Sequence, residues 1–334
     1  ILPHAGSRYS LKGVGMRTSA YTWGGRVLIS VFLWMSSLIG QTNGTVTLEL
    51  LLTLGEESAE LFQWAGVCTD EDENIYVTDM MDNSIKKFSP QGDLITSKSL
   101  PSTDGANAKA IRLIGYRENH LYVTDQNKAG LLRFDSNLNY RGSIAYAKPV
   151  ADFSVHNSNL IHVTPVTMSG MMKIDAIDST GKVQKSYSMA SEGKGGMHDM
   201  FSFTQDYLGD WYVCYRFKDR VARITPTGQE VWKTQLYPGK KTVTEKILFF
   251  EVPKTVFYLD AAFDSHDHLF LLLGHLARNP NRDILVMDRS GQIISQLTLD
   301  DTSHLLHIDR NDNLYVRAQK GTVLKKYKIL DKSP

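Results

Sequence analysis

Residues 66–95, GVCTDEDENIYVTDMMDNSIKKFSPQGDLI, consist of short alternating runs of apolar and polar residues separated by Asp, Asn and Gly turn signals. This pattern predicts a meander of antiparallel strands. Related patterns return in five later stretches, at residues 114–144, more faintly at 153–188, and then at 203–232, 263–294 and 308–330. Each copy has an aromatic residue or a histidine in its second strand, and these markers are Tyr76, Tyr122, His162, Tyr212, Phe270 and Tyr315.

The markers are separated by 46, 40, 50, 58 and 45 residues. Repeats of this length are typical of propeller blades or solenoid coils. Each unit offers about four strands and no amphipathic helix, which favours a propeller. A single four-stranded sheet cannot bury both of its faces, so the units must stack, and closing them into a ring protects their edges. The sequence therefore predicts an all-β fold over residues 45–330, a six-bladed β-propeller of four-stranded antiparallel blades.

The last unit has only three strand-like segments, near residues 304–308, 314–317 and 322–329. One strand is missing from this blade. The stretch TVTLELLLTL, residues 45–54, precedes the first unit, has a strand-like apolar content and has no partner of its own. We expect it to complete the sixth blade as its outermost strand and to close the ring.

The two clearest units resemble NHL repeats. IYVTDMMDNSIKKFSPQG and LYVTDQNKAGLLRF follow the NHL pattern of an aromatic, a hydrophobic residue and an Asp, then an Ile-x-x-Phe strand and a Gly turn. YVTD at residues 76–79 and 122–125 is also similar to the YWTD propellers of the TolB-like group, with Val in place of the Trp. Either resemblance implies six blades.

The segment at residues 16–40 has the layout of a secretory signal. Arg17 and Arg26 precede an apolar run of 13 residues, 27–39, which is followed by small and polar residues. A helix of that length spans about 20 Å, less than the roughly 30 Å of a bilayer core, so we expect no stable membrane span. The segment predicts a secreted or periplasmic protein. Leu38 makes a poor cleavage site, which leaves a short uncleaved anchor as an alternative, and a core helix is a further one.

Residues 1–15 precede Met16, and we interpret them as a leader that is not part of the native protein. The 37 basic and 36 acidic residues give a net charge of +1, which disfavours a nucleic-acid partner. Cys68 and Cys214 lie far apart without the spacing of a zinc or redox motif, so we expect free, packed thiols. The sequence contains no nucleophile elbow, phosphate loop or dinucleotide fingerprint.

Candidate binding residues follow from the register of the innermost strands, because propeller ligands usually bind where those strands begin. Counting back ten residues from each marker gives Gly66, Arg112, Asp152, Ser202, Asp260 and Leu305. The ionisable members of this set and their ionisable sequence neighbours are expected to meet at the tunnel mouth, and they are Arg112, Asp152, His198, Asp199, Asp260 and His304. Polar side chains are also expected at the wet mouth of any propeller, whatever its function.

No cofactor is predicted, but Asp152 and Asp260 are candidate ligands for a calcium or zinc ion. In that case Arg112 would orient an anionic substrate. His304 and His307, three residues apart on an expected strand, should project to opposite faces and so should not share one ion.

Other polar residues have structural explanations. An Asp recurs six residues before four of the markers, at Asp70, Asp206, Asp264 and Asp309, and predicts capped turns. His266 and His268 are expected to lie in one such turn. The loop at residues 274–283 is longer than its counterparts, and its Arg278 and Arg282 are candidates for a contact with a partner protein.

These observations predict an exported, monomeric binding or scaffold module that recognises a protein, peptide or glycan through the face at the tunnel mouth. The alternative is a metal-dependent hydrolase or lyase, similar to lactonases, with its site at the same mouth. Gluconolactonases and paraoxonases, which share this kind of fold, use a Glu, Asn and Asp set that has no match in this sequence. The resemblance therefore assigns no catalytic residue.

Overall fold

The computed structural model describes nine stretches of the chain, residues 46–55, 61, 63–100, 111–125, 130–155, 160–167, 172–189, 196–248 and 250–331. All of them belong to one compact unit, residues 41–334. The predicted leader and export segment, residues 1–15 and 16–40, lie outside the described residues. No helix in the described part of the chain is long and apolar enough to cross a bilayer.

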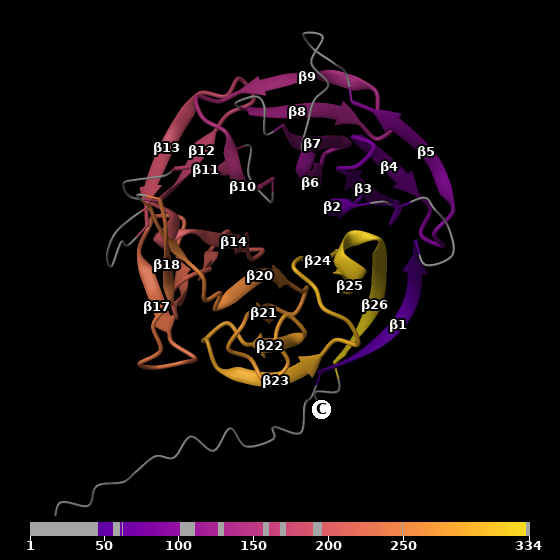
Figure 1. The fold of residues 1–334 in the computed structure, drawn as a ribbon. Coiled ribbons are helices and arrows are strands. Elements are labelled where there is room, and N and C mark those ends of the chain that lie inside the picture. The colour runs from indigo at the N-terminus through magenta and orange to yellow at the C-terminus, as the bar shows by residue number, and fades with distance from the viewer. Residues whose placement is uncertain are drawn as a thin grey trace, which may run out of the picture. The chain divides into compact units, whose positions relative to one another are not determined.

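Six four-stranded antiparallel sheets surround a common centre (Figure 1). The first blade consists of β2 (Trp64–Thr69), β3 (Ile75–Asp79), β4 (Ser84–Phe88) and β5 (Leu94–Ser99). The second consists of β6 (Ile111–Arg117), β7 (His120–Asp125), β8 (Gly130–Asp135) and β9 (Tyr140–Ala145). The third consists of β10 (Val150–Ser154), β11 (Ile161–Pro165), β12 (Lys173–Ile177) and β13 (Val183–Ser188).

The fourth blade consists of β14 (Phe201–Gln205), β15 (Trp211–Tyr215), β16 (Val221–Ile224) and β17 (Glu230–Thr234). The fifth consists of β20 (Tyr258–Phe263), β21 (Leu269–Leu273), β22 (Asp283–Met287) and β23 (Ile293–Thr298). The sixth consists of β24 (Leu306–Ile308), β25 (Asn313–Ala318), β26 (Val323–Asp331) and β1 (Val46–Leu54). The predicted fold class is confirmed.

The strand order explains the burial along each blade. The second strands β3, β11, β15 and β21 are buried at every position, because neighbouring blades cover both faces of each sheet. The outermost strands β5 and β13 are mostly exposed. Four of the six marker residues are completely buried, namely Tyr76, Tyr212, Phe270 and Tyr315.

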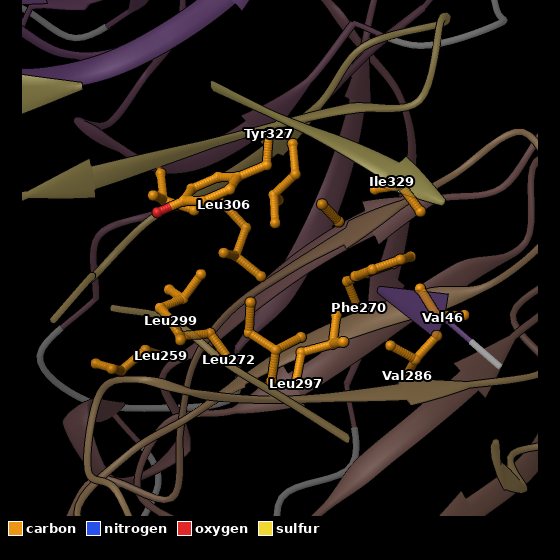
Figure 2. Close-up of a cluster of buried hydrophobic side chains, with 14 of the residues drawn as sticks. Val46, Leu259, Phe270, Leu272, Val286, Leu297, Leu299, Leu306, Tyr327 and Ile329 are labelled. Carbon is orange, nitrogen blue, oxygen red and sulfur yellow. The ribbon is translucent and has the colours of Figure 1, made fainter. Parts of the chain in front are cut away.

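The ring closes through β1, as the sequence predicted. β1 pairs antiparallel with β26 from Val46↔Asp331 to Leu54↔Leu324. Val46 is 1% exposed and packs in one apolar cluster with Phe270 and Val286 of the fifth blade (Figure 2). A strand from one end of the chain therefore completes the blade formed by the other end.

The recurrent Asp residues cap the turns between first and second strands, which confirms that prediction. Asp70 Oδ1 accepts the backbone N–H groups of Asp72 (3.0 Å) and Asn74 (2.9 Å). Asp206, Asp264 and Asp309 accept the N–H groups at the same two offsets. The marker tyrosine of the first blade adds a bond, from Tyr76 Oη to Asp70 Oδ2 at 2.8 Å.

Two further features complete the described chain. A hairpin of β18 (Thr244–Ile247) and β19 (Phe250–Pro253) is inserted between the fourth and fifth blades, and it lies within the longest marker spacing. Two short 3₁₀ turns, η1 (Gly196–Asp199) and η2 (Gln319–Gly321), flank β14 and β26. Cys68 and Cys214 are both free and buried, as predicted.

Candidate functional site

A cavity of about 590 Å³ occupies the centre of the ring. Its walls include residues from the innermost strands of all six blades, β2, β6, β10, β14, β20 and β24, whose labels lie nearest the centre in Figure 1. The remaining lining residues include Met80, Val166, Arg216 and Arg317, which lie at or just beyond the ends of second strands. The cavity therefore lies at the end of the ring where the innermost strands begin, the end at which the sequence places the candidate binding residues.

Backbone pairing puts four of the counted residues at one equivalent position. Gly66 pairs with Thr78, Asp152 with Thr164, Ser202 with Cys214, and Asp260 with Leu272. Each of these partners lies two residues after its marker. Gly66, Asp152 and Asp260 each follow a β-bulge, which shifts the register of the innermost strand.

In the second blade, the residue found by counting back ten from the marker is not the one at the equivalent position. The bulge of this blade lies between Ile111 and Ile114, and Leu113 donates its N–H to Thr124 Oγ1 (3.0 Å) as Gly66 does to Thr78 Oγ1 (3.0 Å). Leu113, and not Arg112, therefore occupies the equivalent position and lines the cavity. The Arg112 side chain lies outside the described part of the structure.

Asp152 and Asp260 make the same contacts in different blades. Asp152 Oδ1 accepts the N–H of Phe153 (2.8 Å), and its Oδ2 accepts the N–H of Phe203 in the next blade (3.2 Å). Asp260 Oδ1 accepts the N–H of Ala261 (2.9 Å), and its Oδ2 accepts the N–H of Leu306 in the next blade (2.9 Å). Each carboxylate thus connects two innermost strands while it lines the cavity.

Burial dominates the electrostatics of this pair. Burial, and then the charge of Asp260, raises the pKa of Asp152 to about 8, against the lowering effect of its two backbone bonds. Burial also raises the pKa of Asp260 to about 6, while its backbone bonds and the Arg216 guanidinium lower it. At neutral pH the Asp152 carboxyl therefore holds a proton in much of the population and can donate a hydrogen bond.

Four basic residues line the same cavity: Arg216, Arg317, His304 and His307. Burial lowers the pKa of His304, and the charges of Arg317 and Arg216 lower it further, so its imidazole is neutral at neutral pH. Arg317 Nε donates to the backbone carbonyl of Trp64 at 2.5 Å. A Cβ atom on Gly321, whose φ is +97°, would lie 2.1 Å from Arg317 Nη2, so this glycine makes room for the guanidinium.

Arg216 and Arg317 were not among the residues predicted from the sequence. A signal was present for Arg317, because it lies two residues after its marker, where Thr78, Thr124 and Thr164 lie in other blades. A charged residue at that position is an exception to the repeat. Arg216 lies beyond the end of β15, and nothing in its spacing distinguishes it.

Three of the predicted site residues, His198, Asp199 and His304, lie outside the innermost strands. His304 and His307 both line the cavity. His304 precedes β24, so strand alternation does not apply to it, and the His307 ring packs against Tyr315. That the two histidines do not share one ion stays a prediction. His198 and Asp199 lie in η1 and are not among the lining residues. Asp199 is buried and forms an ion pair with Lys218.

The predicted partner loop joins β21 to β22. Arg278 is exposed there, whereas Arg282 Nε donates to the backbone carbonyl of Leu299 at 2.7 Å. The Arg282 side chain therefore also holds the loop to its own blade. A role of either arginine in partner binding stays a prediction.

The described residues do not assemble a three-ligand metal site. Within them, no group of three or more His, Cys, Asp and Glu side chains lies close enough to hold an ion. The two candidate ligands, Asp152 and Asp260, each use both oxygens to accept backbone N–H groups. A calcium or zinc ion at these residues stays a prediction.

Several solved structures resemble this chain in fold. A member of the DUF4221 family from Bacteroides vulgatus has a TM-score of 0.60 at 13% identity, covering 87% of this chain and 100% of that one. Virginiamycin B lyase from Staphylococcus aureus has a TM-score of 0.54 at 14% identity, covering 85% and 99%. Its catalytically inactive variant with quinupristin has a TM-score of 0.55 at 12% identity, covering 85% and 99%.

No family model matches the sequence, and no curated protein matches it. The identities to the solved structures are too low to show more than the fold. The comparisons therefore establish that the chain is a six-bladed β-propeller, similar in architecture to a lyase and to a DUF4221 protein.

Proposed function

We propose that this protein is an exported NHL-type propeller that binds a peptide, a glycan or part of a protein at the mouth of its central cavity, without catalysis. The observation that carries the proposal is the cavity itself. Its volume of about 590 Å³ lies in the range of small-ligand sites. Ionisable acidic and basic residues from four blades line it, and a few polar groups placed in this way can fix the orientation of a bound ligand.

Export rests on the sequence of residues 16–40, which has the layout of a secretory signal. A secreted or periplasmic location would expose the cavity to extracellular peptides and glycans. Detection of the protein in the periplasm or medium of an expressing cell, and its loss from there when residues 16–40 are deleted, would test this part of the proposal.

Immobilised glycan and peptide arrays test the binding function. Ala151 lines the cavity, and Ala151→Phe would fill part of it without removing a charge. Ser97→Phe adds the same side chain at an exposed position on the outermost strand β5. We expect the wild type and Ser97→Phe to retain the same array ligands and Ala151→Phe to lose them at least tenfold.

If no glycan or peptide is retained by the wild type, or if Ala151→Phe retains the same ligands as the wild type, the cavity is not the binding site. In the second case the loop at residues 274–283 becomes the next surface to test. Arg278→Ala is the suitable variant there, since Arg282 also bonds to Leu299 O.

A metal-dependent lyase or hydrolase is the second candidate, and His304 favours it. A neutral imidazole in a cavity can accept a proton from a substrate, and the fold is shared with virginiamycin B lyase. Metal analysis of the purified protein, with and without Asp152→Asn and Asp260→Asn, tests the metal. Incubation with quinupristin, which was bound to the similar inactive lyase, tests the reaction. Stoichiometric metal that both variants lose, or a new chromatographic product that His304→Asn abolishes, would replace the binding proposal with the enzyme.

A further inference from the structure

Three of the basic residues that line the cavity are Arg216 of the fourth blade and His304 and Arg317 of the sixth. The charges of the two arginines help to lower the pKa of His304. Arg216 also interacts electrostatically with Asp260. Arg216, Arg317 and His304 form the basic side of the cavity, whose lining also includes Asp260.

Arg216 is the group on this side that is available to a ligand. Its side chain lines the cavity, burial lowers its pKa, and no carboxylate among the described residues lies within ion-pair distance of it. A guanidinium that is partly removed from water gains most when a carboxylate pairs with it through two parallel hydrogen bonds.

Arg317 is fixed beside this group. Its Nε bond to Trp64 O and the space left by Gly321 hold the guanidinium in one place, so little side-chain entropy remains to be lost on binding. His304 contributes a neutral imidazole, which can donate an N–H. The basic side thus offers several hydrogen-bond donors to a ligand in the cavity, and the Arg317 guanidinium among them is held in place.

We propose that the basic side of the cavity, formed by Arg216, Arg317 and His304, binds the carboxylate of a compact ligand. This inference rests on the proposed binding function and names the ligand chemistry. Arg216 anchors the carboxylate, and Arg317 and His304 set its position. Two sources supply such a group at this size, the uronic acid of a glycan and the C-terminus of a peptide. The protonated Asp152 carboxyl can donate a hydrogen bond to a hydroxyl or carbonyl oxygen elsewhere on the same ligand.

Isothermal titration calorimetry with two matched probe pairs tests the proposal. D-galacturonate is compared with D-galactose, and N-acetyl-dialanine with its C-terminal amide. We expect at least one acid to bind ten or more times tighter than its neutral counterpart, which corresponds to about 1.4 kcal/mol. A preference for galacturonate alone identifies a uronate ligand, and a preference for the free peptide alone identifies a peptide C-terminus.

Substitutions of Arg216 test whether this residue causes the preference for the acid probe over its neutral counterpart. Arg216→Gln keeps hydrogen-bond donors but removes the charge, and we expect it to abolish the preference for the acid. Arg216→Lys keeps the charge without the paired geometry and should retain only part of it. Arg141→Gln is the matched control, because Arg141 is exposed on β9 and pairs with Asp135 on the outside of the second blade. Gly321→Ala should displace Arg317 and weaken the preference while Arg216 is intact.

Three outcomes overturn the inference. They are equal affinity for acid and neutral probes, a preference that survives in Arg216→Gln with native stability, and no binding of either acid up to about 10 mM. The same measurements distinguish a failure of this inference from a failure of the proposed binding function. If the neutral probes bind and Ala151→Phe removes that binding, the cavity is a ligand site and only the carboxylate assignment is wrong.

Discussion

Asp152 and Asp260 show how one residue serves both the ring and its cavity. Each carboxylate accepts an N–H from the innermost strand of the next blade, so it holds neighbouring blades together where they converge. Both carboxyl groups are buried away from water as a result, and this burial raises the pKa of Asp152 to about 8 and that of Asp260 to about 6. Stability should therefore depend on pH through these two groups.

Asp152→Asn tests this dependence. In the unfolded chain the carboxyl ionises near its usual pKa of 3.8, and in the folded protein near 8. Between these values the folded state retains a proton that the unfolded state has released, so the contribution of Asp152 to stability is complete below about pH 4 and is lost as the pH rises to 8. From pH 5 to 8, we expect the free energy of unfolding of the wild type to fall relative to the variant by about 1–3 kcal/mol.

Urea unfolding at several pH values measures this difference. Asp260→Asn provides the comparison, because its difference from the wild type should level off near pH 6. A constant difference between the wild type and Asp152→Asn from pH 5 to 8 would show that Asp152 ionises in the folded protein as it does in the unfolded chain.

The sequence was sufficient to predict where Asp152 and Asp260 lie, but not the whole cavity. Counting from the markers works because each innermost strand pairs with its second strand in the same register. It fails for Arg112 because a shifted bulge moves the register by one residue. The position of Arg317 depends on Trp64 and Gly321, one of them in another blade, and no repeat pattern encodes such a contact.

At the level of the elements, some side chains of β1 pack inside the ring and others are exposed to solvent. Val46 is 1% exposed, whereas Leu51 on the same strand is 50% exposed. The repeats predicted about four strands in each blade, and the apolar content of residues 45–54 together with the missing strand of the last blade predicted β1. The β18–β19 hairpin was not predicted, because it has no counterpart in the repeat and its apolar residues Ile247 and Leu248 are exposed.

Truncating side chains along β1 tests its contribution to the closure. Val46→Ala removes part of a side chain that packs with Phe270 and Val286, and we expect a loss of about 1–3 kcal/mol in the free energy of unfolding. Leu51→Ala, on the same strand, should change it by less than about 0.5 kcal/mol. Denaturant unfolding followed by intrinsic fluorescence measures both. Equal effects of the two substitutions would mean that β1 contributes no packing to the ring.

For the whole molecule, stability depends on a continuous ring in which each blade covers the face of the next. The pairing of Val46 with Asp331 places the start of β1 beside the end of β26. These two strands pair antiparallel like the third and fourth strands of the other blades, but no turn connects them.

A circular permutant tests whether this closure depends on the order of the chain. A short Asn-Gly turn would join residues 331 and 46, and the new ends would lie between β1 and β2, at residues 55 and 61. All native strand pairs are then possible, and β1 becomes a local partner of β26, so loop closure costs less entropy than in the natural order. We expect one cooperative unfolding transition with a midpoint at or above that of the wild type.

A matched chain without residues 46–54 exposes Phe270, Val286 and the β26 edge, and it should be less stable and prone to aggregate. If the permutant unfolds in two steps while the truncated chain keeps the native midpoint, the sixth blade does not need β1 and the ring is held by the other five interfaces.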